Sequence, residues 1–238
     1  RQVRTGKMKL TKEEIGHLRD LYDAEVRFVD EQLGRLVNAM KKMGLLDTSY
    51  IVVTADHGEE HFEHGGFEHG HRYEDETVRV PLIIRAPGGR WNANKRVPWS
   101  AGLIDLFPTI LEWFGKPIPD HAQGKSLNPL ITGKENAHRE YFMEHKLYGA
   151  WQFAWFDGRY KLITDKDSKN LWVYDLKNDP NEKKKLTDHP KVAELKERLF
   201  NHRKQLEEKH VLNKNKDETV PVIPKEVEDA LRSLGYIE

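Results

Sequence analysis

Apolar residues near the start of the chain recur with the period of an amphipathic helix. Between Thr11 and Met43 they lie three and four residues apart, which places them on one face of a helix. Thr11 and Glu14 have the spacing of a capping box, and Gly44 supplies a C-terminal stop. We therefore predict one long helix over residues 11–43. Similar patterns predict shorter helices over residues 105–114, 190–210 and 224–234.

Short apolar runs rich in β-branched or aromatic residues predict the strands. Residues 50–54 have the pattern of a buried parallel strand, and residues 81–85 look like a second buried strand. From about Arg139 the chain becomes richer in aromatic and β-forming residues. Three runs, with Asp157-Gly158 as a hairpin turn between the first two, predict a small antiparallel sheet over residues 151–156, 159–164 and 171–176. The pattern predicts an α/β portion over residues 1–138 and an α+β subdomain over residues 139–238.

Composition narrows the classes of function. The 39 basic and 39 acidic residues give a formal net charge of zero, so nothing points to a nucleic-acid or membrane-surface partner. The 238 residues include no cysteine, which excludes a disulfide scaffold, a cysteine-based zinc site and a cysteine nucleophile within this chain. No apolar run approaches the roughly 18 residues that a membrane-spanning helix needs.

The candidate chemistry is concentrated in residues 54–76, TADHGEEHFEHGGFEHGHRYEDE, which we call the histidine loop. Five of the chain's 12 histidines lie here. Asp56 and His57 directly follow the first predicted strand, at the end where ligands bind in open α/β sheets. A carboxylate and an imidazole together suit divalent cations of intermediate hardness, and Gly58 permits a sharp turn. The alternative is an Asp that caps a helix beside a surface histidine.

Three further histidines of the loop, His64, His69 and His71, lie among glycines, too irregularly spaced for one helix face. Histidine can ligate a metal, donate a hydrogen bond to an oxyanion or protonate a leaving group. A flexible surface loop that binds metals adventitiously is the alternative. The spacing is neither that of a zinc finger nor that of a His-Glu-x-x-His helix.

Val53–Glu60, VTADHGEE, closely resembles the metal-binding signature of sulfatases in the alkaline phosphatase superfamily. The resemblance continues in the same order along nearly the whole chain, in residues 21–36, 79–84, 105–111, 157–162, 176–181 and 231–238. It implies an alkaline-phosphatase-like sheet sandwiched by helices, of which residues 1–138 are the C-terminal part, followed by an α+β subdomain over 139–238. It also implies that the chain corresponds to the C-terminal half to two-thirds of such an enzyme.

The resemblance assigns roles to individual residues. It implies that Asp56 and His57 are metal ligands, with Ca²⁺ as the expected ion and Zn²⁺ or Mn²⁺ as alternatives. Many sulfatases have a lysine after this loop that contacts the sulfate. This chain has none there, so His69 or His71 is expected to assist the leaving group, and His64 to lie near the bound substrate. Histidine loses its charge near neutrality, where lysine does not.

The family's nucleophile is a formylglycine made from Cys or Ser in a Cys/Ser-x-Pro-x-Arg context, which this chain lacks. We therefore expect the nucleophile in an upstream N-terminal segment of the same protein. Without that segment, we expect strand edges and apolar surface of this chain to be left uncovered. The expected activity is hydrolysis of a small-molecule or glycan sulfate ester. The alternatives are a phosphate or phosphonate ester hydrolase of the same superfamily, and an incomplete half that binds metal without turnover. Sulfatases are often exported, but this chain alone does not indicate a compartment.

Overall fold

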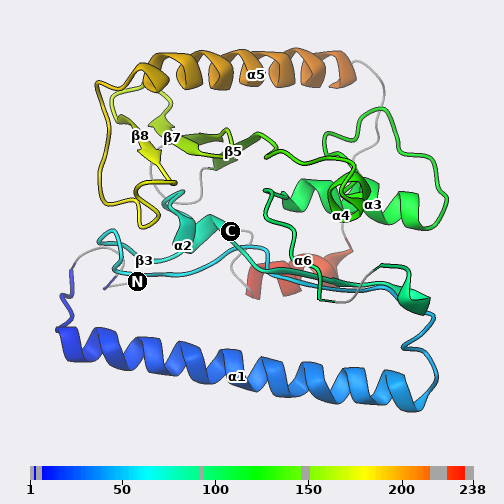
Figure 1. The fold of residues 1–238 in the computed structure, drawn as a ribbon. Coiled ribbons are helices and arrows are strands. Elements are labelled where there is room, and N and C mark those ends of the chain that lie inside the picture. Colours follow the sequence, from blue (N-terminus) through cyan, green and yellow to red (C-terminus); the bar gives the residue numbers. More distant parts are fainter. Residues whose placement is uncertain (1–2, 4–6, 92–93, 146–150, 215–223, 234–238) are drawn as a thin grey trace. The chain divides into compact units, whose positions relative to one another are not determined.

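The computed structural model describes residues 3, 7–91, 94–145, 151–214 and 224–233 (Figure 1). The chain divides into two compact units, residues 1–199 and residues 200–238. All the site residues discussed below belong to the first unit. The division expected from the sequence, between residues 138 and 139, is a different one and stays a prediction.

The long N-terminal helix, α1 (Lys12–Lys42), begins and ends where its caps predict. The Thr11 side chain accepts a hydrogen bond from the Glu14 amide, and the Glu14 carboxylate accepts one from the Thr11 amide at 2.7 Å. Gly44 follows the C-cap with a φ of +70°. None of the α1 residues is buried, and Phe28 and Val29 are each more than 60 % exposed. Part of the apolar face of α1 therefore lies at the surface.

The first two predicted strands pair with each other. β1 (Ile51–Thr54) and β4 (Leu82–Arg85) form a two-stranded antiparallel sheet in which Val52 lies opposite Ile84. The parallel, buried arrangement predicted from their composition is wrong for this pair, since Ile83 is 63 % exposed. An apolar β-branched run indicates a strand, but it carries no information about the direction of its partner.

A four-stranded antiparallel sheet organises the second half of the first unit, as predicted. Its strands, in the order in which they pair, are β5 (Tyr141–His145), β6 (Gln152–Phe156), β7 (Tyr160–Asp165) and β8 (Leu171–Asp175). The predicted hairpin turn joins β6 to β7, with the Asp157 amide donating to the Tyr160 carbonyl at 3.1 Å. The aromatic pattern did not predict β5.

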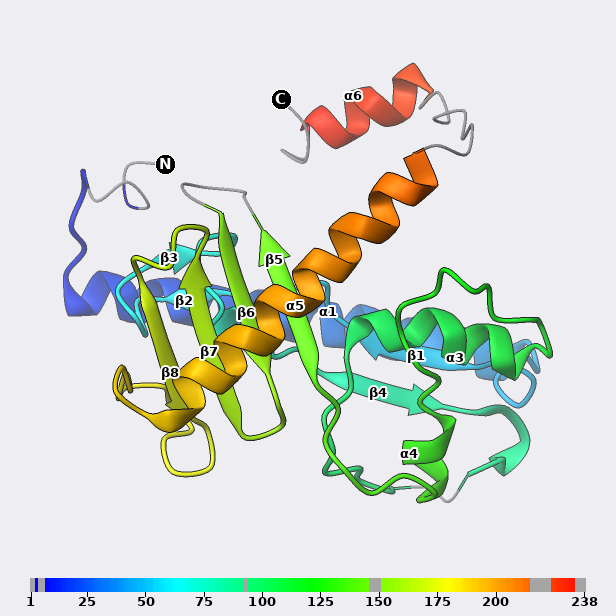
Figure 2. The ribbon, with the colours of Figure 1, turned by 90° about the horizontal axis from the view of Figure 1, so that it is seen from above.

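Both faces of this sheet are covered. Successive strand residues point to opposite faces. On one face Ala154, Ile163 and Tyr174 pack against Tyr73 of the histidine loop, and all four are buried. Figure 2 shows the first part of α5 (Pro190–Lys214) lying across the strands. Leu195 and Leu199 of this part are fully buried. The sheet thus forms a core that also holds the histidine loop.

The remaining elements are short. They are β2 (Glu60–His61), β3 (Phe67–Glu68), α2 (Asp75–Val78), α3 (Leu106–Trp113), α4 (Asn128–Thr132), the 3-10 turns η1 (Pro87–Gly89) and η2 (Leu103–Asp105), and, in the second unit, α6 (Lys225–Ser233). The helices predicted over 105–114, 190–210 and 224–234 correspond to α3, α5 and α6, except that residue 234 lies outside the described residues. Among the described residues, no helix combines the length and apolar character needed to cross a membrane.

Candidate active site

The histidine loop folds into a small hairpin followed by one helical turn. β2 and β3 pair so that Glu60 lies opposite Glu68, and the Phe62 amide closes the turn onto the Gly66 carbonyl at 2.9 Å. This pairing brings Glu59, just before β2, beside His69, just after β3. α2 then ends next to the start of the loop, where the Gly58 amide donates to the Thr77 carbonyl at 2.9 Å.

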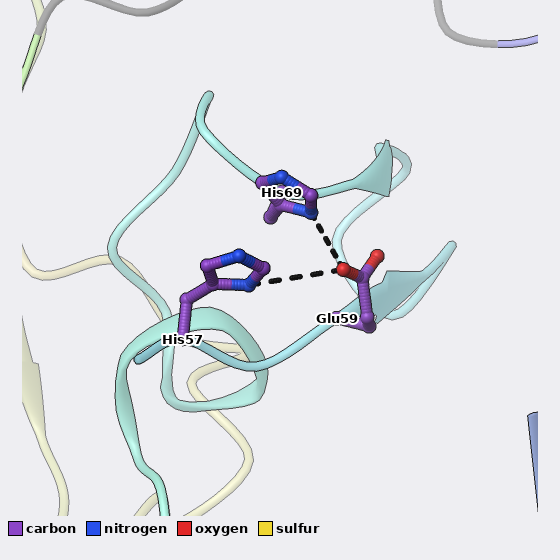
Figure 3. Close-up of side chains that lie close together, drawn as sticks. All are labelled: His57, Glu59 and His69. Carbon is purple, nitrogen blue, oxygen red and sulfur yellow. Dashed lines mark hydrogen bonds and ion pairs between the residues drawn. The ribbon is translucent and has the colours of Figure 1, made fainter. Parts of the chain in front are cut away.

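Three side chains of this hairpin form what we call the open cluster: His57, Glu59 and His69 (Figure 3). The imidazole rings of the two histidines stack with centroids 3.8 Å apart. Oε1 of Glu59 lies 2.5 Å from Nδ1 of His69 and 3.8 Å from Nδ1 of His57. Each of the three side chains remains 24–37 % exposed. Ligand atoms of all three lie within 4.8 Å of one another, which is close enough for a single metal ion to recruit them.

Asp56 lies at the edge of this cluster. Its Oδ2 is 3.8 Å from Nε2 of His57, and its Oδ1 accepts a hydrogen bond from the His57 amide at 3.0 Å. The Asp56 side chain is 71 % exposed. No helix of the described residues begins here, since the loop continues into β2. Asp56 is therefore not a helix cap, and the assignment of Asp56 and His57 as a pair of metal ligands stays a prediction.

A second group of the same residue types, Glu60, His64 and Glu76, lies inside the protein, and we call it the sealed cluster. Nδ1 of His64 bonds the Glu76 carboxylate, and Nε2 lies 2.8 Å from the Glu182 carbonyl. Both partners are acceptors, so the ring is suited to be an imidazolium that donates to each. Burial lowers the pKa of His64, but the bonds to Glu76 and Glu182 outweigh burial and raise it overall. The expected substrate-binding role of His64 stays a prediction, and it would require one of these bonds to open.

Glu60 is the centre of the sealed cluster, and its side chain is fully buried. Oε1 accepts hydrogen bonds from the amides of His64 at 2.8 Å and Gly66 at 2.7 Å. Oε2 lies 2.9 Å from Nε2 of His71 and 3.4 Å from the Arg72 guanidinium. Burial alone would raise the pKa of Glu60, but these bonds lower it to about 2. A buried carboxylate with this many donors is ionised and fully paired.

His71 therefore points into the protein, whereas His69 belongs to the open cluster. The bond to Glu60 raises the pKa of His71, and its other nitrogen, Nδ1, lies 3.1 Å from the His69 carbonyl. His71 thus connects the sealed cluster to the backbone that carries His69. The structure brings three of the five predicted site residues together, Asp56, His57 and His69, and places the other two, His64 and His71, in and against the sealed cluster.

Two adjacent glycines let the hairpin turn this tightly, for different reasons. Gly65 has a φ of +86° with open space around its Cα. At Gly66 an added Cβ would lie 2.2 Å from Nε2 of His71 and 2.4 Å from Oε2 of Glu60. Gly65 is thus required by its backbone conformation, and Gly66 by the contact between His71 and Glu60.

The open cluster borders a broad cavity of about 2230 Å³, whose lining includes Asp56, His57 and His69. Among the described residues, its lining includes eight Lys or Arg residues, three Asp residues and no Glu. The basic residues are Arg72, Arg79, Arg85, Lys95, Arg96, Arg159, Lys161 and Lys177. Arg72, Arg79, Arg85, Arg159 and Lys161 form ion pairs with carboxylates. The lining is therefore less positive than the number of basic residues suggests, but it still offers basic groups to an anionic ligand.

Sequence reasoning missed the carboxylates of this region. Glu59 and Glu60 fall within the motif Val53–Glu60, but the sequence assigned them no role of their own. The Gly65-Gly66 pair was nevertheless a signal for a hairpin that would bring Glu59 beside His69. Lys161 and Glu182 were missed because nothing local connects them with a loop about a hundred positions away.

Known protein families and known proteins resemble this chain in sequence. Residues 1–116 match the sulfatase family model, and residues 62–210 match the model of the N-sulphoglucosamine sulphohydrolase C-terminal region. Arylsulfatase K of Xenopus laevis is 32 % identical over 188 residues, which cover 72 % of this chain and 34 % of the relative. An N-acetylglucosamine-6-O-sulfatase of Bacteroides thetaiotaomicron is 35 % identical over 199 residues, covering 77 % of this chain and 34 % of that protein.

Solved structures extend the likeness to the fold. A protein in complex with its substrate D-glucosamine-2-N,6-O-disulfate matches with a TM-score of 0.64 and 30 % identity, over 81 % of this chain and 40 % of that one. A phosphonate monoester hydrolase from Silicibacter pomeroyi matches with a TM-score of 0.71 and 29 % identity, over 83 % of this chain and 43 % of that one.

These matches define an α/β chain with an alkaline-phosphatase-like fold, as the sequence predicted. The chain belongs to the sulfatase family. It spans about a third of the length of the curated relatives it matches.

Proposed function

We propose that the protein containing this chain is a metal-dependent hydrolase of sulfuric esters. The observation that carries the proposal is the open cluster with Asp56 at its edge. It borders a cavity whose lining includes basic residues, in a chain of the sulfatase family. An ester of sulfuric acid keeps a negative charge on its non-bridging oxygens. A cavity with basic and metal-ligating groups in its lining suits such a ligand.

The donor set fits a divalent cation. Asp56 and His57 would hold it, with Glu59 within reach as a further carboxylate. The bound cation would neutralise charge on the ester oxygens and on the ionised nucleophile. Ca²⁺ is the ion that the family leads us to expect. The imidazole ligand suits Zn²⁺ or Mn²⁺ better, so metal analysis of the purified protein decides between them.

The contacts favour His69 over His71 as the proton donor. Glu59 holds Nδ1 of His69, which leaves Nε2 to give a proton to the leaving alcohol oxygen as the sulfur–oxygen bond breaks. Nε2 of His71 is already bonded to the buried Glu60. The nucleophile that forms the new bond to sulfur would be a hydrated formylglycine outside this chain.

The substrate we propose is a small-molecule or glycan sulfate ester. Support comes from the basic lining of the cavity and from the relatives named as an arylsulfatase and an N-acetylglucosamine-6-O-sulfatase. A phosphonate or phosphate ester is the second candidate. It is favoured by the phosphonate monoester hydrolase, which is almost as similar in sequence as the structure with a sulfated sugar.

The test uses the full natural polypeptide and compares kcat/KM for 4-nitrophenyl sulfate with that for 4-nitrophenyl phosphate and a phenylphosphonate monoester. We expect the sulfate to be preferred, activity to be lost with EDTA and restored by one divalent ion, and mass spectrometry to find formylglycine. His57→Ala should abolish the activity. His17→Ala, on the exposed side of α1, is the matched control and should retain it. A preference for the phosphonate would favour the second candidate, a phosphonate or phosphate ester. If none of the three esters were hydrolysed, both candidate substrates would be overturned.

A further inference from the structure

A buried lysine of the C-terminal sheet reaches the histidine loop. Lys161, on β7, is only 2 % exposed. Its Nζ donates to the Tyr73 carbonyl at 3.0 Å and to Oδ1 of Asp75 at 2.5 Å, and forms an ion pair with Oε1 of Glu182 at 2.8 Å. An ammonium group has three protons, and three oxygens surround this one. The lysine is therefore held by groups on both sides of the contact between loop and sheet.

Glu182 completes this contact from the turn after β8. It is 1 % exposed and has a φ of +53°, which non-glycine residues rarely adopt. Its Oε2 accepts the Asp75 amide at 2.5 Å, and its carbonyl accepts Nε2 of His64 at 2.8 Å. The Asp179 carboxylate secures the turn by accepting the amides of Lys183 and Lys184. A strained, buried residue that meets the loop with both its side chain and its backbone suggests a role in placing the loop.

Two chains of contacts lead from this pair to the open cluster. In the first, Lys161 and Glu182 hold Asp75 at the start of α2, and the Thr77 carbonyl near the end of α2 accepts the amide of Gly58, next to His57. The packing there is close, because a Cβ on Gly58 would lie 2.1 Å from the Glu76 carbonyl oxygen. Any shift of α2 would therefore move the backbone beside His57.

The second chain runs through the sealed cluster. The Glu182 carbonyl holds His64, and the His64 amide donates to Glu60. Glu60 in turn holds His71, whose Nδ1 contacts the carbonyl of His69. Every link is 2.8–3.1 Å long. The two chains end on His57 and His69, the two rings that stack in the open cluster.

We infer that Lys161 and Glu182 are positioning residues for the active site: they fix α2 and the histidine loop so that His57 and His69 face each other. The C-terminal subdomain would then set the geometry of the metal-binding end of the site without touching the substrate. This inference deepens the proposed function and rests on it only for the meaning of the metal affinity. The placement of the loop can be measured separately.

The experiment compares wild type with Lys161→Met and with the double variant Lys161→Met/Glu182→Leu in the full polypeptide. Removing one partner leaves a buried charge unpaired, which destabilises the protein, whereas replacing both with apolar groups of similar size is often close to neutral. Because Lys161 also bonds Asp75 and the Tyr73 carbonyl, the double variant still leaves these two groups without that partner. It should therefore be less destabilised than Lys161→Met, but not as stable as wild type. Lys169→Met, an exposed lysine after β7, is the matched control.

Three quantities are measured: the melting temperature, hydrogen exchange of peptides covering residues 56–78, and the Kd for Mn²⁺ and Ca²⁺. We expect the double variant to melt between Lys161→Met and wild type, and to exchange faster in residues 56–78 but not in β6–β8. It should bind the metal about 10–100-fold more weakly, the usual range for groups that orient ligands. Wild-type exchange and metal affinity in the double variant would overturn the inference. Equally raised exchange across β6–β8 would also overturn it, by showing general destabilisation.

The exchange measurement keeps the two proposals distinguishable. A wild-type protein that hydrolyses no sulfate ester contradicts the proposed function, yet the protection of residues 56–78 still reports whether Lys161 and Glu182 place the loop.

Discussion

The open and sealed clusters use the same kinds of residue within one short stretch of chain, yet their surroundings differ. In the open cluster Glu59 and the two histidines keep about a quarter to a third of their side-chain surface exposed. In the sealed cluster Glu60 is fully buried, and the side chains of His64 and Glu76 are 9 % and 15 % exposed. The polar atoms of Glu60 and His64 are already bonded to protein groups.

This difference shows how a residue type acquires a role. A histidine whose two nitrogens are bonded to protein acceptors holds the structure together, because binding a ligand would leave a buried group unpaired. A histidine with one nitrogen oriented by a carboxylate keeps the other for a ligand. Sequence spacing does not separate the two cases, since both arise from the same run of His and Glu.

The largest effect should come from breaking the sealed cluster at its centre. Glu60→Leu removes the acceptor of the His64 and Gly66 amides and of the His71 ring, so these donors would stay buried without a partner. We expect the free energy of unfolding to fall by about 3–5 kcal/mol, as when one member of a buried pair is removed. Denaturant unfolding of the full polypeptide measures it.

The matched control for this variant is Glu31→Leu on α1. Glu31 pairs with Arg35, and both side chains are at least 60 % exposed. Its removal should change the free energy of unfolding by less than about 0.5 kcal/mol. Similar losses for Glu60→Leu and Glu31→Leu would contradict the account of the sealed cluster.

The open cluster should respond in the opposite way, with loss of ligand binding and little loss of stability. Glu59→Gln removes the charge beside Nδ1 of His69 and His57 while keeping the shape of the side chain. We expect metal binding to weaken by about 10–100-fold. Stability should change by no more than about 0.5 kcal/mol. Calorimetric titration with the metal and a thermal melt distinguish these effects, and a large drop in melting temperature with unchanged metal affinity would reverse the comparison.

The dependence of the free energy of unfolding on pH should reflect the protonation of His64. Its pKa is raised in the folded protein, where Glu76 and the Glu182 carbonyl accept its protons. The stabilisation is therefore fully present below the unfolded pKa of about 6.5 and is lost as the pH rises through the higher folded pKa. Wild type should lose stability in this window, and His64→Gln should lose less. Parallel stability curves for the two proteins between pH 6 and pH 9 would show that His64 does not contribute.

The smallest effect should come from the remaining histidine of the same stretch. His61 belongs to neither cluster, and its ring packs edge-on against Tyr22 with centroids 5.1 Å apart. His61→Ala should alter metal affinity by less than twofold and the free energy of unfolding by about 0.5 kcal/mol, as for most surface changes. A tenfold loss of metal affinity would mean that His61 contributes to metal binding, although the hairpin geometry places it outside both clusters.

The sequence predicted those features of the fold that depend on a few neighbouring residues. The caps of α1 at Thr11 and Gly44 and the Asp157-Gly158 turn were predicted because each depends on a few neighbouring residues. Asp56 and His57 were placed together because they are adjacent at the end of β1. Strand direction and burial failed for β1 and β4, since both depend on what covers a strand rather than on its own residues.

Long-range relations were beyond such reasoning. Sequence left the choice between His69 and His71 open, and it is the pairing of β2 with β3 that puts His69 beside His57 and turns His71 toward Glu60. Lys161 and Glu182 reach the loop only because β7 and the turn after β8 pack against it. The two clusters therefore depend on tertiary contacts that no local pattern encodes.

The two glycines of the hairpin have a consequence for directed evolution. In a library randomised over the loop and selected for activity, Gly65 should be replaced by Asn more readily than by other residues, because Asn tolerates a positive φ and the space there is open. Gly66 should be recovered unchanged, since even a methyl group would collide with His71 and Glu60. The two adjacent glycines would thus tolerate different sets of substitutions.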